Sequence, residues 1–390
     1  MRASDVFWRF LLLGCTSFGG PAAHLGYFHR EFVQRLNWLS ADEYGKLVAL
    51  SQLLPGPGSS QVGFAIGRHR AGLAGAIAAF TGFTLPAFLL MFGLASFTLQ
   101  PQLPDWLVII SQGLKLLAVV VVSDAVINMF RQYCQRGISR CLALISTLVL
   151  VAYSSSAMQF AVLGLAALLA LAQPARFAPQ HQTRLSTPPD SINRPLLAVF
   201  ALLFGLSLWL IYWPPGPDHV LLSMAAQFYH SGSLVFGGGH VVLPLLQENV
   251  AGSLSEQQFL LGYAAAQGVP GPMFSLASYL GATMTHQAPL SGALIATVAL
   301  FLPGLLLMFT LQQHWQYLSA KPRISAIAAA LNAAVVGLLF SALLHPLLSS
   351  AVDSYSDSLA VLVGLLLLRG LSVPIWLLIA AFISYAWLGL

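Results

Sequence analysis

Long apolar runs without charged residues constrain this chain more than any other feature. Three of them approach the ~20 residues that cross a bilayer as a helix: Leu196–Trp213, Ser291–Leu311 and Leu371–Leu390. Hydrophobic residues make up 57% of the 390 residues and Asp, Glu, Lys and Arg only 7%, too few to solvate a globule of this size. In lipid the backbone must satisfy its own polar groups, and apolar runs without alternation favour helices over a barrel. We therefore predict an all-α polytopic membrane protein.

Two stretches of the chain carry the same landmarks in the same order. Four of them recur at offsets of 218, 215, 215 and 217 residues: Phe18-Gly19-Gly20-Pro21 with Phe236-Gly237-Gly238-Gly239, Leu39-Ser40 with Leu254-Ser255, Gln52 and Pro55-Gly56-Pro57 with Gln267 and Pro270-Gly271-Pro272, and Leu85-Pro86 with Leu302-Pro303. This order and spacing indicate an internal duplication. We predict an N-terminal repeat at 1–172, a cytoplasmic linker and extra crossing helix at 173–213, and a C-terminal repeat at 214–390.

The distribution of Lys and Arg predicts that the two repeats have opposite orientations. Arg68 and Arg70 precede the predicted span 72–98, whereas Lys321 and Arg323 follow its counterpart. Cytoplasmic loops are enriched in basic residues, so the same helix runs in opposite directions in the two halves, as in inverted-repeat transporters. Further basic loops place spans at 103–130, 141–154 and 156–172. We expect a bacterial inner (cytoplasmic) membrane protein with a cytoplasmic N-terminus and a periplasmic C-terminus.

Each repeat opens with segments interrupted by glycine and proline. In the first half they are roughly 5–19, 21–36, 41–55 and 58–69, and ~15 residues give about 22 Å of helix, short of the ~30 Å hydrocarbon core. The segments either pair as re-entrant hairpins or cross completely. The first alternative gives about nine full spans plus hairpins, and the second about thirteen spans.

The turns between the broken segments are the predicted binding site. Pro21, Pro57 and Pro272 are placed to begin helices, whose N-termini expose unpaired N–H groups and partial positive charge. Several such ends around one cavity favour an anion. The predicted binding residues are Gly19, Gly20, His24, Gln52, Pro55, Gly56, Pro57, Ser59, Ser60, Gln61, Gly237, Gly238, His240, Gln267, Pro270, Gly271, Pro272 and Ser275. For His24 and His240 a structural role is an open alternative.

Charged residues inside the apolar segments are the other candidates. Lys115 lies near the middle of the 103–130 span, where a charge costs at least ~2.5 kcal/mol, and its counterpart is Asn332. Either Lys115 and Asn332 contact the substrate, or Lys115 pairs with a carboxylate such as Asp124. We assign Arg30, Glu31 and Asp124 structural or coupling roles, with Arg30 and Glu31 as a local pair.

Several classes of protein do not fit the sequence. The basic residues, with a net charge of +5, lie between apolar segments rather than in a patch, so nucleic acid is not an expected partner. Cys15, Cys134 and Cys141 lack metal-ligand spacing, and neither a zinc helix nor a Ser/His or Asp dyad is present, so we expect no metal, no cofactor and no enzyme activity. We also expect the N-terminal segment to be retained rather than cleaved as a signal peptide.

Several motifs resemble the chromate ion transporter family in its long, two-unit form. They are Phe18-Gly19-Gly20-Pro21-Ala22-Ala23-His24, Trp38-Leu39-Ser40, Gln52-Leu53-Leu54-Pro55-Gly56-Pro57, Ser59-Ser60-Gln61-Val62-Gly63, Arg70-Ala71-Gly72 and Phe83-Thr84-Leu85-Pro86. The resemblance implies export of chromate, giving chromate resistance, with sulfate as an oxyanion of the same shape. Asp124 departs from it, since a neutral residue is usual there. The bilayer is the other expected partner and a homodimer is an open alternative. A permease for another small solute, such as sulfate or an amino acid, is the rival function.

Overall fold

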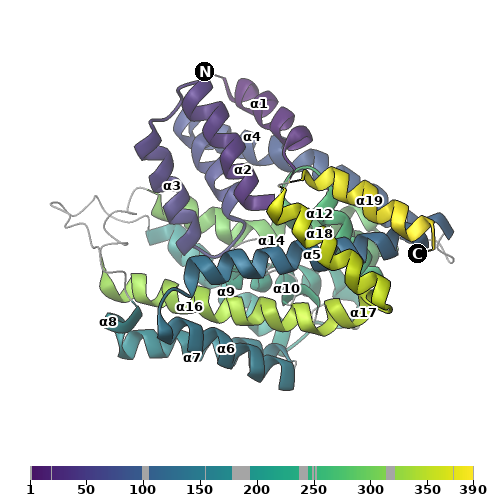
Figure 1. Ribbon diagram of the computed structural model, residues 1–390. Coiled ribbons are helices and arrows are strands. Elements are labelled where there is room, and N and C mark those ends of the chain that lie inside the picture. Colours follow the sequence, from purple (N-terminus) through teal and green to yellow (C-terminus); the bar gives the residue numbers. More distant parts are fainter. Residues whose placement is uncertain are drawn as a thin grey trace.

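The computed structural model describes residues 2–18, 20–98, 105–153, 155–177, 194–236, 245–247, 250, 253–312, 321–371 and 373–389. Throughout these residues the regular structure is helical, with no strand (Figure 1). In the described part of the chain, five helices are long and apolar enough to cross a membrane: Gly58–Thr98, Val108–Tyr133, Arg194–Tyr212, Pro289–Leu311 and Pro322–Ala351. Three shorter apolar helices span Gly137–Ala152, Ala157–Ala172 and Ile375–Trp387. The prediction of an all-α polytopic membrane protein is confirmed.

The first half of the chain begins with short helices and continues with longer ones. Its helices are α1 (Ala3–Thr16), α2 (Gly20–Phe28), a π-helix η1 (His29–Arg35), α3 (Ala41–Leu53), α4 (Gly58–Thr98), α5 (Asp105–Tyr133), α6 (Gly137–Ala152), α7 (Ser156–Ala172) and α8 (Pro174–Phe177). Helix α4 is broken at Ala71 and Gly72, where Gly72 has a φ of 63°. The observed bounds lie close to the predicted broken segments because Gly, Pro and Ser residues end and cap these helices locally.

The second half repeats this order after one additional helix. Its elements are α9 (Arg194–Tyr212), η2 (Pro217–His219), α10 (Val220–Leu234), α12 (Glu256–Gly268), η4 (Met273–Ser275), α13 (Leu276–Met284), α14 (Pro289–Leu311), α16 (Pro322–Ala342), a π-helix η5 (Leu343–Leu348), α17 (Ser349–Ala351), α18 (Tyr355–Gly370) and α19 (Ile375–Trp387). Corresponding helices start with corresponding caps. Ser40 and Glu43 form a capping box on α3, and Ser255 and Gln258 form one on α12.

Matched glycines hold corresponding helices together in both halves. Gly67 and Gly75 bring the two parts of α4 so close that a Cβ on either would collide with the other's carbonyl oxygen. Gly281 and Gly292 do the same for α13 and α14. Small residues allow this close approach of backbones in membrane proteins. The two parts of α4 in the first half and the pair α13 and α14 in the second half therefore pack in the same way.

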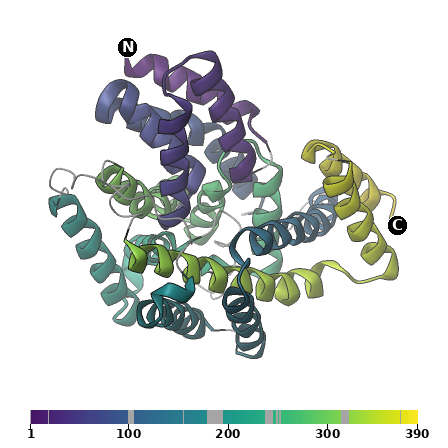
Figure 2. The same ribbon diagram turned by 60° about the vertical axis from the view of Figure 1, so that its left-hand side comes forward.

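The last helices of each half pack against the other half. Helices α6 and α7 lie along α16, and α18 and α19 lie along α5 (Figures 1 and 2). Gly337 of α16 allows the close contact between α16 and α6, since a Cβ at this position would collide with the Ala143 carbonyl of α6. Gly113 of α5 lies equally close to Phe382 of α19, where a Cβ would come within 2.5 Å of the carbonyl oxygen. The two halves are thus interlocked.

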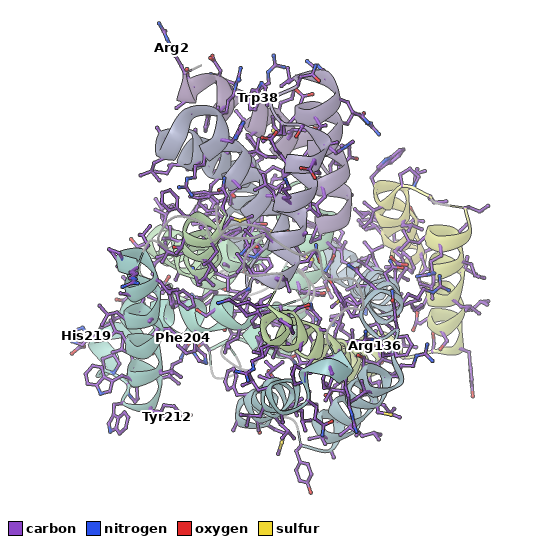
Figure 3. All side chains as sticks on the ribbon, turned by 90° about the vertical axis from the view of Figure 1, so that its left-hand side faces the viewer. Arg2, Trp38, Arg136, Phe204, Tyr212 and His219 are labelled. Atoms are coloured by element: carbon purple, nitrogen blue, oxygen red, sulfur yellow. The ribbon has the colours of Figure 1, made fainter. Side chains whose placement is uncertain are left out.

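Helix α9 lies at the periphery of the bundle. It packs against α10 and α14 and carries large exposed apolar side chains, including Leu202 and Trp209. Tyr212, at its end, projects away from the rest of the molecule (Figure 3). Exposed leucines on a protein otherwise so poor in charge are typical of a lipid-facing surface.

Candidate functional site

Two reciprocal hydrogen bonds join the glycine–proline turns of the two halves. The Gly56 N–H donates to the Val235 carbonyl oxygen at 2.7 Å, and the Gly271 N–H donates to the Ser17 carbonyl oxygen at 2.9 Å. Ser17 corresponds to Val235 at the offset of 218 residues, and Gly56 to Gly271 at 215. A contact that recurs with its partners exchanged indicates a two-fold relation. The turns of both halves therefore meet at one place inside the bundle.

A cavity of about 940 Å³ opens beside the turns of the first half. The polar groups in its wall come from α1, α2, α3, the start of α4 and the second half of α5: Thr16, Tyr27, Ser51, Gln52, Ser59, Asp124, Asn128, Gln132 and Tyr133. Leu368 and Val373–Trp376, from the end of α18 to the start of α19, complete it. The cavity is large enough for a hydrated small ion and lies within an apolar helix bundle.

Two helix N-termini contribute to this wall. Helix α2 starts at Gly20 with Pro21 as its second residue, and Pro21 lines the cavity. Helix α4 starts directly after Pro57, and both Gly58 and Ser59 line the cavity. In the second half η4 follows Pro272 directly in the same way. Unpaired N–H groups and the helix dipole make these ends favourable for a negative charge.

Buried polar side chains surround the start of α4. The His24 ring is 1% exposed, and its Nδ1 lies 3.3 Å from the Ser59 Oγ. Among the described residues no partner is found for the His24 Nε2 or for the Oγ of Ser60 and of its counterpart Ser275. Buried polar groups are normally hydrogen-bonded, so these atoms are suited to bind water or a ligand.

The two glutamines near the first turn have different surroundings. The Gln61 Nε2 donates to the carbonyl oxygens of Pro55 and Gly304, which ties the turn to α14. Gln52 lines the cavity, and its Oε1 accepts a hydrogen bond of 2.6 Å from the Tyr133 hydroxyl. Its counterpart Gln267, like Pro270, Gly271 and Pro272, is not part of this wall. The described cavity therefore belongs to the first half's turns.

An ion pair lies at the α5 wall of the cavity. The Arg369 Nη1 donates to the Asp124 Oδ1 at 2.6 Å and to the Asn128 Oδ1 at 3.1 Å, and the Asn128 Nδ2 donates to the Asp124 Oδ2 at 2.9 Å. Sequence reasoning did not single out Arg369, Asn128 or Tyr133. One signal was available for Arg369, since a lone cation in the apolar 355–370 stretch needs a partner, as Asp124 does.

The predicted local pair of Arg30 with Glu31 is wrong. Glu31 binds Arg35 at 3.0 Å and Arg9 at 3.6 Å. Neighbouring residues on a helix project in different directions, whereas residues four apart lie on the same side. The carboxylate therefore joins α1 to η1.

The remaining predicted residues fall into two groups. Lys115 is partly buried on α5 and Asn332 is buried on α16, and neither lines the cavity. Gly19, Gly237, Gly238 and His240 lie outside the described residues. In the described part of the chain no group of His, Cys, Asp or Glu could hold a metal ion.

Multiple apolar helices around a cavity with polar groups in its wall, with helices broken at that cavity, define a multi-pass membrane transporter. A family model described as chromate transporter matches residues 4–172 and 222–387, and the chain belongs to that family. No solved structure matches the chain.

Three curated relatives carry names that refer to chromate. The chain is 28% identical to a probable chromate transport protein of Synechococcus elongatus, over 85% of this chain and 81% of that protein. It is 28% identical to a chromate transport protein of Cupriavidus metallidurans, over 92% of this chain and 86% of the other. For a chromate transport protein of Pseudomonas aeruginosa the identity is 27%, over 87% and 80% of the two chains.

Proposed function

We propose that this protein exports chromate from the cytoplasm, with sulfate as an analogue of the same shape and charge. The observation that carries the proposal is the cavity, where the N-termini of α2 and α4 lie beside Ser59 and Gln52. Hydrogen-bond donors arranged in this way suit a tetrahedral oxyanion. The names of the relatives support the same substrate.

The charge pattern supports a cytoplasmic mouth for this cavity. Its wall includes Gln132 and Tyr133 at the end of α5, directly before a loop and helix start that carry Arg136 and Arg140. Basic residues of this kind flank membrane spans on the cytoplasmic side. In this proposed orientation the cavity opens to the compartment from which chromate is exported.

The membrane potential favours this direction. With a negative interior, one charge gains ~2.3 kcal/mol per 100 mV, so a leaving dianion gains about 4.6 kcal/mol. Export therefore needs no other driving force, whereas uptake would require coupling.

The architecture that we infer consists of two units, 1–172 and 214–390, related by an axis in the membrane plane, with 173–213 as linker and additional crossing. The exchanged hydrogen bonds of Gly56 and Gly271 support the two-fold relation. The peripheral helix α9 supplies the odd crossing that inverts the second unit.

We also propose that Lys115 contacts the substrate on its path from the cavity to the opposite side of the membrane. It lies six residues before the cavity-lining Val121, about 9 Å along α5 toward the opposite side. An ammonium group in the apolar interior is costly and typically functional.

The direct test is chromate transport by the purified protein in proteoliposomes. Loaded vesicles with an imposed potential should release chromate faster than vesicles without protein, and excess sulfate should slow the release. Cells that carry the gene should accumulate less chromate than cells without it. Release of labelled amino acids but not of chromate or sulfate would contradict the proposal.

A further inference from the structure

The cavity contains a feature that an anion site should not have, namely a carboxylate in its wall. Asp124 is the acidic residue among those that line it, and its side chain is 26% exposed. Alone, this carboxylate would repel a dianion. It is neutralised by Arg369, whose side chain is 25% exposed. Arg369 does not itself line the cavity, but it is bonded to Asp124 and Asn128, which both do.

The duplicated fold does not need this ion pair for packing. At the offset of 217 residues, Asp124 corresponds to Ser341, Asn128 to His345 and Arg369 to Ala152. Helices α16 and α6, which carry Ser341 and Ala152, therefore pack against each other without an acidic or an Arg residue at these two positions, and His345 lies just beyond α16 in η5. Burying an ion pair costs desolvation that apolar packing does not, so the pair in one half alone indicates a function.

Arg369 has further N–H donors that could bind a second anion. The hydrogen bonds that the structure gives it within the described chain all use Nη1. The guanidinium group has five N–H donors in a planar fork, which matches the geometry of an oxyanion. Helix N-termini supply only partial charges, about half a unit each, so a dianion in a low-dielectric cavity gains from one full charge as well.

We propose that Arg369 is the specificity-determining cation for a tetrahedral dianion in this cavity, and that Asp124 is an internal anion exchanged for it. In the empty cavity the Asp124 carboxylate accepts the hydrogen bond from Arg369 and neutralises its charge. An entering oxyanion takes over the Arg369 donors, while Asn128, which bonds both partners, retains the Asp124 carboxylate. This inference rests on the proposed function, because it names a residue of the same oxyanion site.

If the exchange occurs, removing the charge of Arg369 and removing the charge of Asp124 have opposite effects on substrate binding. A purely structural salt bridge does not predict opposite effects. Removal of Arg369 takes away a charge that binds the substrate. Removal of the Asp124 charge takes away a competitor and leaves Arg369 to the substrate. A structural pair would instead lose stability from either side, because each single change leaves an uncompensated charge.

The experiment measures equilibrium binding of radiolabelled chromate to purified full-length protein, with thermal stability of each variant recorded in parallel. The variants are Arg369→Gln, Arg369→Lys, Asp124→Asn and the double variant Asp124→Asn/Arg369→Gln. Arg131→Gln, an exposed cation in the last turn of α5, is the matched control.

We expect Arg369→Gln to weaken chromate binding at least tenfold and Arg369→Lys to weaken it less. Asp124→Asn should tighten binding several-fold and slow release from proteoliposomes. The double variant should bind as weakly as Arg369→Gln, and the control should bind like the wild type.

Two results would overturn the inference. One is a double variant that regains wild-type affinity and stability after both single variants have lost them, which would make the pair structural. The other is an Asp124→Asn variant whose affinity is unchanged or weaker, which can be measured even if Arg369→Gln does not fold. Failure of the wild type itself to bind chromate or sulfate would instead contradict the proposed function.

Discussion

Gly56 lies against Gly304 of α14 so closely that a Cβ on Gly56 would stand 2.8 Å from the Gly304 Cα. The corresponding pair in the other half is Gly271 and Ala87, where a Cβ on Gly271 would lie 3.1 Å from the Ala87 Cβ. Gly56 has a φ of 113° and Gly271 a φ of 102°, values that residues with a side chain rarely adopt. Each turn is thus seated on a long helix of the opposite half, with no space for a side chain.

Gly56→Ala should therefore lower both stability and transport. The strained backbone alone costs roughly 1–3 kcal/mol, and the displaced turn moves the α4 N-terminus. Thermal unfolding of the purified protein and chromate release from proteoliposomes measure the two effects. Gly93→Ala is the control, because a Cβ on that helical glycine meets nothing within 4 Å. Wild-type transport by Gly56→Ala would show that the turn is not part of the site.

Matched loops of the two units should be exposed on opposite sides of the membrane. Gln135 follows α5, and Asp353, 218 residues later, precedes α18, and both are exposed. In a background without Cys15, Cys134 and Cys141, Gln135→Cys should react only with a membrane-permeant reagent. Asp353→Cys should also react with an impermeant one from outside. Labelling of both from the same side would contradict the inverted relation.

Tyr133→Phe should weaken chromate binding without loss of protein. The change removes the hydroxyl that donates to the Gln52 Oε1 and so frees Gln52 to turn away from the cavity. The net value of one such bond, about 0.5–1.5 kcal/mol, corresponds to a roughly two- to tenfold rise in Kd. Tyr153→Phe, at a side chain that is 66% exposed, is the control. A fall in melting temperature with unchanged Kd would assign Tyr133 to packing.

Lys115→Met should reduce chromate export more than protein abundance, and Lys115→Arg should retain part of the activity. The reason is that an ammonium group along the path lowers the cost of a dianion in a low-dielectric interior. Chromate accumulation in cells, with immunoblots of the membrane fraction, measures both quantities. The structure pairs Asp124 with Arg369, so adding Asp124→Asn should not restore export. Restoration by that double change would place Lys115 in the scaffold.

Local signals were sufficient to predict most of the helices. The predicted segment 41–55 is α3, and the predicted 58–69 is the first part of α4, because Ser40 caps one and Pro57 precedes the other. Apolar runs, caps and Gly-Pro turns act over a few residues, so a sequence displays them directly. The π-helix at His29–Arg35 was not predicted, since it depends on a local change of winding without a composition of its own.

Contacts between distant residues could not be predicted in the same way. Asp124 and Arg369 are 245 residues apart, and their pairing depends on α18 lying along α5 of the other half. The duplication predicted which helices correspond but not that the last two of each half would be exchanged. For the same reason the glycines of the turns were identified, whereas the cation that pairs with Asp124 was not.

The exchange of the terminal helices has a consequence for how the protein is made. Helix α6 leaves the ribosome well before α16, against which its Ser146 and Thr147 are buried. The 150 residues from Ala172 to Pro322 take about 8–30 seconds to synthesise at ordinary rates. During that interval the Thr147 hydroxyl lacks the Gly337 carbonyl oxygen that it bonds in the complete fold, so α6 and α7 remain in the bilayer or beside an insertion factor until α16 is made. Neither half is then a finished folding unit, and the bundle closes only when the second half arrives.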